Sequence, residues 1–267
     1  MIHPTAVIHP QAKLDSTVEV GSYAVIDAGV ELGPHCSVGP HVHLTGLTSV
    51  GAHNVFHAGC VIGGPPQDLK YRGEPTRLRI GAHNVFREGV TVNRSNTLAE
   101  DTVLGSHNYL MATSHVGHNC HLGDQVIIAN GTSLGGHVTV ADRAFLSGNC
   151  LVHQFVRVGT LALMQGGSAI SRDLPPFTVA RGDNGICGLN TVGLRRAGFT
   201  PAQRLELKRL YRLLFREGRD VRAALTAAAS GFSSEPARLL IEFLRASRRG
   251  VCFDKGVNLR DGREPVD

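Results

Sequence analysis

Residues 104–170 read, in groups of six, LGSHNY LMATSH VGHNCH LGDQVI IANGTS LGGHVT VADRAF LSGNCL VHQFVR VGTLAL MQGGSA I, and every group begins with an apolar residue. The same phase extends back to Ile2, and over 29 successive positions it lapses only at Asp68 and Glu74. A helix repeats near 3.6 residues and a strand near 2, so neither alone produces a strict period of six. The period therefore predicts a β-helix built from hexapeptide repeats.

Two further positions of the six-residue repeat are restricted. The residue after the apolar one is often glycine, which we expect at tight corners because glycine adopts backbone angles that cost other residues energy. The fourth residue after the apolar one is mostly small or β-branched, so we expect it to fill a narrow interior. Four cysteines occupy this interior position, where a free thiol packs as a small hydrophobe: Cys36, Cys60, Cys120 and Cys150. With three repeats per coil, about nine coils would stack at roughly 4.8 Å each.

The repeat ends near residue 186, and the chain then becomes rich in Leu, Ala and Arg. We therefore predict two domains, a β-helix over 1–186 and a helical domain over 187–267. An external loop is predicted at about 64–76, where prolines and charges replace the repeat. Thr200 to Gln203 have the form of a capping box with proline at the first helical position. The predicted helices run from Pro201 to a stop at Gly218, from Val221 to Ala229, and from Pro236 to Arg248 before Gly250.

The net charge of +5 is unevenly distributed along the chain. From Asn190 onward there are 16 Lys and Arg against 9 Asp and Glu, a net +7, which leaves −2 for the rest. Such a basic end favours an acidic partner, although a solvated helical surface rich in arginine accounts for it equally well. The chain carries no recognisable nucleic-acid motif, so nucleic acid is not the expected partner.

Cysteine usage points to a reducing compartment, and hydropathy gives no sign of a membrane span. The six cysteines include no CxxC pair. The repeat begins at Ile2, which leaves no room for a signal peptide, and no apolar run approaches the length of a membrane span. We therefore expect a cytoplasmic protein without an integral membrane segment.

Three histidines share one edge of the predicted prism. In a coil of 18 residues, His118, His137 and His153 fall at phases 10, 11 and 9, with Gln154 at 10 and His115 beside them. Zinc requires ring nitrogens about 2.0 to 2.1 Å from one ion, whereas two coils separate the outer pair by roughly 10 Å. One chain therefore does not close a zinc site, while a metal shared between chains remains open. The stripe better suits a substrate groove in which one imidazole acts as a general base.

Four segments closely resemble the UDP-N-acetylglucosamine O-acyltransferases of lipid A biosynthesis. They are QDLKY (67–71) with GEPT (73–76), SHVGHNC (114–120), VHQF (152–155) and GLNTVGLRR (188–196). The resemblance covers both predicted domains, and it implies a left-handed parallel β-helix with a C-terminal helical domain. It also implies a homotrimer with active sites between subunits that needs neither a cofactor nor a metal.

The activity implied by the resemblance is transfer of an (R)-3-hydroxyacyl group from acyl carrier protein to the 3-position of UDP-N-acetylglucosamine. His118 matches the general base, Gly136 is placed to stabilise the oxyanion with its backbone N–H, and Gly166 matches the residue that limits acyl length. An acidic carrier protein would also account for the basic C-terminal region. The residues that match substrate contacts are Gln67, Asp68, Lys70, His115, His137, His153, Gln154, Asn190 and Arg196.

This sequence departs from the family pattern around the acceptor sugar. Asn119 stands where many relatives carry Asp, Asn93 where some carry His, Val192 in place of an acidic residue, and Ala197 in place of an arginine. A 3-amino analogue of the sugar nucleotide is therefore an alternative acceptor. The other classes left open are the later N-acyltransferase of the pathway, whose members carry an additional N-terminal domain, a hexapeptide-type zinc carbonic anhydrase, and a scaffold without activity.

Overall fold

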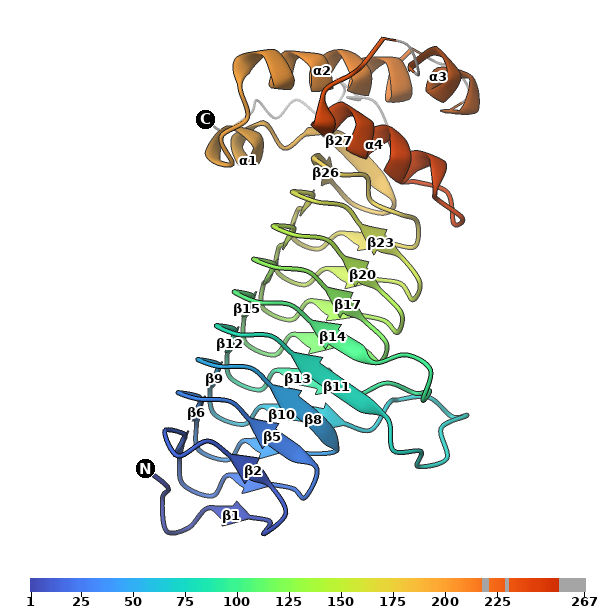
Figure 1. Ribbon diagram of the computed structural model, residues 1–267. Coiled ribbons are helices and arrows are strands. Elements are labelled where there is room, and N and C mark those ends of the chain that lie inside the picture. Colours follow the sequence, from blue (N-terminus) through green and yellow to red (C-terminus); the bar gives the residue numbers. More distant parts are fainter. Residues whose placement is uncertain (218–220, 229–230, 255–267) are drawn as a thin grey trace.

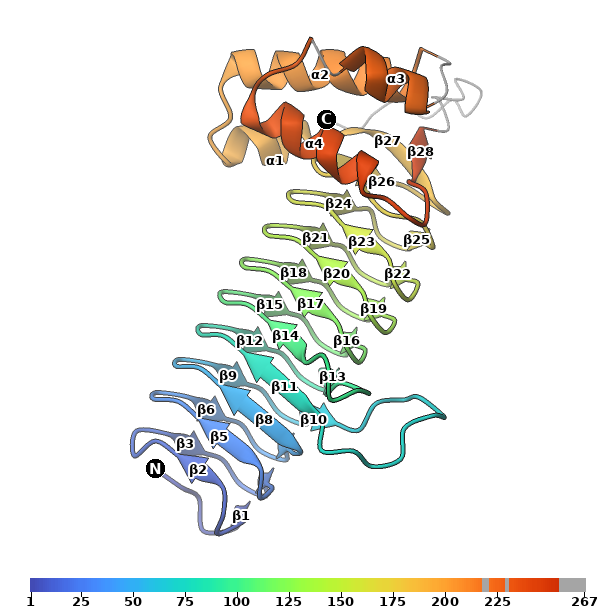
Figure 2. The ribbon, with the colours of Figure 1, turned by 45° about the vertical axis from the view of Figure 1, so that its right-hand side comes forward.

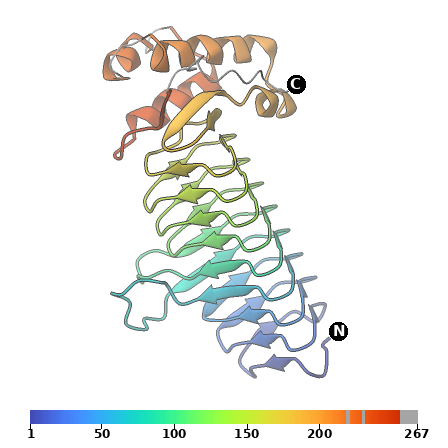
Figure 3. The same ribbon diagram turned by 180° about the vertical axis from the view of Figure 1, so that it is seen from behind.

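The computed structural model describes residues 1–217, 221–228 and 231–254. Short strands form three sheets along a tapering prism, with the N-terminus at one end and helices over the other (Figures 1 and 3). Each coil passes once through every sheet, so neighbouring strands within a sheet belong to successive coils and pair in parallel. The predicted β-helix of hexapeptide repeats is confirmed.

We number the three faces of the prism. Face 1 consists of β1 (Val7–Ile8), β4 (Val25–Ile26), β7 (His43–Leu44), β10 (Val61–Gly64), β13 (Thr91–Asn93), β16 (His115–Val116), β19 (Ser133–Leu134), β22 (Leu151–Val152) and β25 (Ala169–Ile170). Face 2 consists of β2 (Lys13–Leu14), β5 (Val30–Leu32), β8 (Leu47–Val50), β11 (Arg77–Ile80), β14 (Thr102–Leu104), β17 (His121–Leu122), β20 (Thr139–Val140) and β23 (Arg157–Val158). The chain passes from face 1 to face 2 and then to face 3.

Face 3 is the longest sheet because the C-terminal region extends it. Its repeat strands are β3 (Glu19–Val20), β6 (Ser37–Val38), β9 (Val55–Phe56), β12 (Val85–Phe86), β15 (Tyr109–Leu110), β18 (Ile127–Ile128), β21 (Phe145–Leu146) and β24 (Leu163–Met164). Beyond them lie β26 (Thr178–Ala180), β27 (Gly185–Leu189) and β28 (Phe253–Asp254). Strand β27 runs antiparallel to β26, which ends the regular stack.

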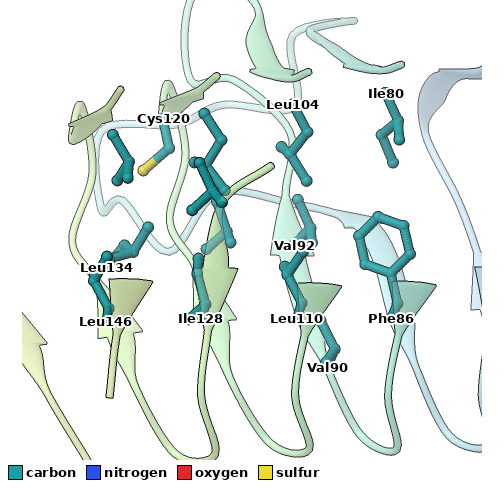
Figure 4. Packing of buried hydrophobic residues seen from close by; sticks show 14 of the residues in the cluster. Ile80, Phe86, Val90, Val92, Leu104, Leu110, Cys120, Ile128, Leu134 and Leu146 are labelled. Atoms are coloured by element: carbon teal, nitrogen blue, oxygen red, sulfur yellow. The ribbon is translucent and has the colours of Figure 1, made fainter. Parts of the chain in front are cut away.

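The core consists of the apolar residue of each repeat and the small residue four positions later. Figure 4 shows Phe86, Leu110, Ile128 and Leu146 side by side in one row, on successive coils of face 3 where they are register partners. The four cysteines predicted for the interior are all buried. Burial raises the pKa of the Cys60 thiol to about 11, so it stays protonated at neutral pH and packs as an apolar group.

We expected glycine after the apolar residue because of its freedom in backbone angles, and this reason is wrong at most corners. A Cβ at Gly51 would lie 2.8 Å from the Gly81 carbonyl oxygen of the next coil, so glycine is needed there for close approach between coils. Left-handed backbone occurs two residues later in the repeat, as at His53 (φ 58°) and Asn149 (φ 56°). Asparagine tolerates this region better than most residues, and glycine without cost.

A second interruption escaped the sequence analysis because it keeps the six-residue phase. Leu98 was expected to be a repeat position, but it lies between β13 and β14 in a loop over 94–101 and is 59% exposed. The loop adds one repeat length between strands of adjacent faces, so the phase on either side still agrees. The stretch 65–76, between β10 and β11, adds two repeat lengths and projects from the prism (Figure 2). We call 65–76 the proline loop and 94–101 the Glu100 loop.

The C-terminal helices are α1 (Thr191–Arg196), α2 (Pro201–Phe215), α3 (Val221–Ala228) and α4 (Glu235–Arg245). They enclose a second hydrophobic cluster that includes Leu207, Leu210 and Leu240. The predicted capping box at Thr200 and Gln203 is confirmed, whereas α1 was not predicted and α4 ends before Arg248. The predicted limits at Gly218 and Ala229 lie outside the described residues.

A buried carboxylate joins the helices to the prism. Asp173 is 1% exposed, pairs with the Arg157 guanidinium at 2.9 Å, and accepts a hydrogen bond from the Ser247 hydroxyl at 2.8 Å. Arg157 also donates to the Phe243 carbonyl oxygen, which extends this contact to α4. Among the described residues, none of the helices has the length and apolar character needed to cross a bilayer.

Candidate active site

Most of the polar side chains predicted for the site lie along the corner where the chain turns from face 1 to face 2, which we call the loop corner. The proline loop leaves this corner after β10 and the Glu100 loop leaves it one coil later, after β13. His118 lies on the next coil between β16 and β17, followed by Gly136 with His137 and then by His153 with Gln154. Five successive coils therefore contribute to one edge.

The His118 imidazole is oriented by its sequence neighbour. Its Nδ1 lies 2.8 Å from Oδ1 of Asn119, a residue that is 2% exposed. Because an amide oxygen only accepts hydrogen bonds, Nδ1 of the neutral ring carries the proton and Nε2 keeps its lone pair. This tautomer is the one that a general base acting through Nε2 requires.

The Glu100 loop fixes the amide of Asn119. The Nδ2 group donates to the Ser95 hydroxyl at 2.8 Å and to the Glu100 carboxylate at 3.2 Å, while Oδ1 accepts the Asn96 N–H at 3.0 Å. A flipped amide would oppose oxygen to carboxylate and N–H to N–H, so this network selects one orientation. Ser95, Asn96 and Glu100 were missed by the sequence analysis because the repeat phase continued through them.

The proline loop reaches the same network through Asp68. Its carboxylate accepts the Lys70 backbone N–H at 2.9 Å and the Asn96 side-chain amide at 2.7 Å. These hydrogen bonds, with a smaller contribution from nearby His118, hold the pKa of Asp68 below its usual range. Asn96 of the Glu100 loop therefore contacts the proline loop through its side chain and Asn119 through its backbone N–H.

Two further histidines surround His118 in neutral form. The His137 ring meets the His118 ring edge-on, with 5.2 Å between the ring centroids, and stacks on the Phe155 ring with 4.5 Å between centroids. The Nδ1 of His115 lies 2.7 Å from the Thr91 hydroxyl. Burial, and then the neighbouring His118, lowers the pKa of both His115 and His137, although Glu100 opposes the shift at His137.

Gly136 is required by the space that the His118 ring occupies. A Cβ at this position would lie 2.6 Å from both Cε1 and Nε2 of that ring. The Gly136 N–H donates to no acceptor among the described residues, whereas its carbonyl oxygen accepts from Phe155. A free backbone N–H therefore lies beside the nitrogen that keeps its lone pair.

A groove with a volume of about 620 Å³ runs from this corner across face 1. The outward residues of face 1 are register partners and change in character along it, from His115 and Ser133 to Leu151 and Ala169. Leu151 is 56% exposed although it is apolar. Of the predicted site residues, the groove is lined by Gln67, His115, His118, Gly136, His153 and Gln154.

Asn93 is a further groove residue, noted in the sequence analysis only as a departure. The residue is 7% exposed, and its Nδ2 donates to the Pro65 carbonyl oxygen at 3.0 Å. Its Oδ1 has no hydrogen-bond partner among the described residues. An unpaired buried acceptor in a groove is suited to a ligand hydroxyl or amide.

Three predicted residues lie away from the groove within one chain. Asn190 caps α1 by accepting from the Gly193 N–H, and its Nδ2 donates to the Leu161 carbonyl oxygen at the corner between faces 2 and 3. Arg196 is exposed in the last turn of the same helix. Gly166 lies at the corner between faces 3 and 1, just before β25.

Family models match two parts of the chain. Residues 173–252 match the model described as UDP-N-acetylglucosamine O-acyltransferase, domain 2, and residues 101–136 match that of the bacterial transferase hexapeptide. An acyl-[acyl-carrier-protein]–UDP-N-acetylglucosamine O-acyltransferase from Herminiimonas arsenicoxydans is 44% identical over 94% of this chain and 98% of its own length. The enzyme of the same name from Alkalilimnicola ehrlichii is 47% identical over the same shares.

Solved structures give the same likeness. The UDP-N-acetylglucosamine acyltransferase of Francisella novicida is 31% identical, with a TM-score of 0.91 and complete coverage of both chains. That of Bacteroides fragilis is 37% identical, with a TM-score of 0.90 over 94% of this chain and 99% of its own. The fold is thus the left-handed parallel β-helix with a C-terminal helical domain.

Proposed function

The chain belongs to the acyl-[acyl-carrier-protein]–UDP-N-acetylglucosamine O-acyltransferases, enzymes of lipid A biosynthesis, and we propose that His118 is its general base. The reaction transfers a 3-hydroxyacyl group from acyl carrier protein to the sugar 3-hydroxyl. The observation that carries the assignment is the hydrogen bond from His118 to Asn119, which leaves Nε2 unprotonated in the groove. Membership of this family excludes the carbonic anhydrase, the scaffold without activity and the later N-acyltransferase of the pathway.

The proton and the acyl group move in opposite directions in this mechanism. Nε2 of His118 takes the proton of the sugar 3-hydroxyl as its oxygen attacks the thioester carbonyl carbon. The tetrahedral intermediate then breaks its C–S bond, and the leaving thiolate takes the proton back from the imidazolium. The products are the sugar ester and the free carrier thiol, and His118 returns to its starting form.

Gly136 supports stabilisation of the oxyanion. Its N–H is unpaired among the described residues and lies beside the His118 ring, where negative charge develops on the carbonyl oxygen. A donor fixed in the backbone needs no reorganisation during the reaction, and removing one such donor typically costs a factor of about 100 to 1,000.

The change of character along face 1 supports two binding regions. Near His118 the groove presents Gln67, His153, Gln154 and the free Oδ1 of Asn93, which suit the hydroxyl and amide groups of a nucleotide sugar. Leu151 and its register partner Ala169 present an apolar strip on this face, which suits an acyl chain running towards the corner of Gly166. Asp68, Lys70 and His137 adjoin the polar region and complete the proposed sugar contacts.

The separation of Asn190 and Arg196 from the groove supports an active site shared between subunits. Both residues matched substrate contacts, yet Asn190 is anchored at a different corner of the prism from His118. A second chain packed against the loop corner brings such residues to the groove. We therefore propose the homotrimer, for which sedimentation equilibrium should give three chains per active particle.

The basic surface of α2 supports an acidic partner. Arg204 and Lys208 line a hollow together with the exposed Leu205 and with Arg195 of α1, and Arg212 is exposed one turn further on. Clustered cations accelerate association with an acidic protein, and the effect weakens as salt rises. We assign this surface to acyl carrier protein. The six unpaired cysteines favour a reducing compartment, in agreement with a cytoplasmic site of reaction.

Mass spectrometry of reaction products tests this function. The protein is incubated with UDP-N-acetylglucosamine, or with its 3-amino analogue, and a panel of 3-hydroxyacyl carrier proteins of different chain lengths. We expect the hydroxyl sugar to gain one acyl group as an ester. Acylation of the amino sugar alone would identify the alternative acceptor, and a folded protein that acylates neither sugar from any donor would contradict the proposal.

A further inference from the structure

The hydrogen-bond acceptor of the His118 ring carries no charge, although proton transfer makes that ring a cation. Asn119 accepts from Nδ1 through an amide oxygen, and a neutral acceptor stabilises an imidazolium less than a carboxylate does. The balancing charge must therefore come from elsewhere. In the described part of the chain, a carboxylate hydrogen-bonded to this same amide lies on its far side, in the Glu100 loop.

We propose that Glu100 is a positioning residue that supplies, through the Asn119 amide, the negative charge balancing the imidazolium formed on His118. The inference rests on the proposed role of His118 as the general base. Oε2 of Glu100 accepts from Asn119 Nδ2 at 3.2 Å, and Asn119 Oδ1 accepts from the His118 ring at 2.8 Å. The amide thus passes the polarising effect of the carboxylate to the ring, since linked hydrogen bonds strengthen one another.

The carboxylate is held in place by groups on two neighbouring coils. Besides Asn119, its oxygens lie 3.5 Å from Nδ1 of His137 and 3.3 Å from Nε2 of His121. Its side chain is 41% exposed and does not line the groove, and its contacts are with the Asn119 amide and two imidazoles. Glu100 therefore acts through the base and not on the acceptor.

Other titratable groups also face His118. Asp68 of the proline loop adds a second negative charge, while His115 and His137 add positive charge only when they are protonated. Because burial lowers the pKa of both of these histidines, they add no charge at neutral pH. Each loop thus supplies one carboxylate near His118, and of these two only that of Glu100 is hydrogen-bonded directly to Asn119.

Glu100→Gln keeps an oxygen that can accept from Asn119 but removes the charge. We expect kcat/KM at its high-pH plateau to fall roughly threefold to tenfold, with the acid limb of the profile moving to lower pH because the imidazolium is less stable. Glu88→Gln is the matched control, since Glu88 is 47% exposed and lies 3.6 Å from His57 at a different corner. We expect no change in the control profile.

A reciprocal exchange separates electrostatics from simple structural damage. Asn119→Asp alone places two carboxylates within hydrogen-bond distance, so one must be protonated and activity at neutral pH should fall. In the double variant Glu100→Gln with Asn119→Asp, the carboxylate stands at residue 119 and accepts directly from the His118 ring. We therefore expect kcat/KM to return to within about threefold of the parent.

The outcomes are distinct. Loss of rate in Glu100→Gln without movement of the acid limb, or a double variant no better than the worse single variant, would overturn the role of Glu100. If Asn119→Asp does not fold, the pH profile of Glu100→Gln decides alone. An inactive parent, or a His118→Ala variant with the parental rate, would instead show that the proposed function has failed.

Discussion

The two loops of the prism leave the same corner on successive coils, yet only one of them is visible in the sequence. The proline loop interrupts the repeat with Asp68 and Glu74, whereas the Glu100 loop places Leu98 where the next apolar residue is due. The inconspicuous loop is the one that holds Asn119 and hence the ring of His118. A periodic pattern therefore counts residues along the chain and does not show that each residue lies on a face.

The loops also differ in what they contribute. The Glu100 loop makes three side-chain or backbone hydrogen bonds to the amide of Asn119, and through it the loop orients the His118 ring. The proline loop reaches this network through the contact of Asp68 with Asn96, and its Gln67 lines the groove. We therefore expect loss of the contacts to Asn119 to alter turnover, and loss of the contacts of Asp68 to alter substrate binding.

Moving the ring without touching either loop should give the largest effect among the variants that keep His118. In Gly136→Ala the new Cβ would lie 2.6 Å from Nε2, so the ring must shift. A displacement of about 1 Å costs roughly 100-fold in rate, and we expect a loss of about 10-fold to 100-fold in kcat. Steady-state kinetics with saturating substrates measures it.

The control for this variant is Gly148→Ala, at the corner between faces 3 and 1. Its Cβ would meet the Asn130 carbonyl oxygen at 3.4 Å, an ordinary contact. Parental kcat in Gly136→Ala would show that the ring position seen in the structure is not the one used in the reaction.

Separating the two loops should give an intermediate effect. Asn96→Ala removes the amide that donates to Asp68 but keeps the backbone N–H that donates to Asn119. A hydrogen bond to a charged group contributes about 1.5 to 3 kcal/mol, so we expect KM for the sugar nucleotide to rise roughly 10-fold with little change in kcat. Thr97→Ala, whose hydroxyl contacts only Ala99 of the same loop among the described residues, is the control. A fall in kcat at constant KM would show that the contact between Asn96 and Asp68 serves turnover and not substrate binding.

The corner of Gly166, towards which we propose that the acyl chain runs, adjoins neither loop and should respond independently. Gly166 has ordinary backbone angles and a Cβ there would meet Gly148 at 3.4 Å, so it accepts a side chain, whereas Gly167 (φ 70°) does not without strain. Gly166→Met should shift preference to shorter donors, since each excluded methylene forfeits about 0.8 kcal/mol, or roughly fourfold in specificity. Competition between donors of different length measures the shift, and an unchanged profile in the active variant would place the limit elsewhere.

The smallest expected effect concerns stability at acid pH. Burial lowers the pKa of His115 in the folded state, so the unfolded chain binds more protons as pH falls through its ordinary value of about 6.5. The folded state is therefore destabilised below that pH. Between pH 7.5 and 5.5 we expect the melting temperature of the parent to fall about 1 to 2 °C more than that of His115→Gln, measured by calorimetry. Parallel melting curves against pH would contradict the shift.

The prism itself was predictable because its period recurs on every coil and buries the same positions. The cysteine interior and the capping box at Thr200 followed from equally local rules. The corner glycines were predicted for the wrong reason, since close approach between coils is a tertiary property that no single repeat displays.

The site was predictable only in part. Matching motifs named His118 and Gln67, but the supports of the base lie in a loop whose sequence keeps the repeat phase. Asn190 illustrates a second limit, because its side chain caps a helix and donates to Leu161 at another corner of the prism. The substrate contact that we propose for Asn190 would need a second chain, which the sequence of one chain does not position.

His118 is the group on which the contacts of both loops converge. The decisive measurement is the single-turnover rate of acyl transfer to UDP-N-acetylglucosamine by the parent and by His118→Ala, with the melting temperatures of both proteins recorded alongside. We predict a rate lower by roughly 100-fold or more in the variant, with an unchanged melting temperature, because the ring orients a proton and does not hold the core. A folded variant that transfers at the parental rate would contradict the assignment of the base and the reading of both loops.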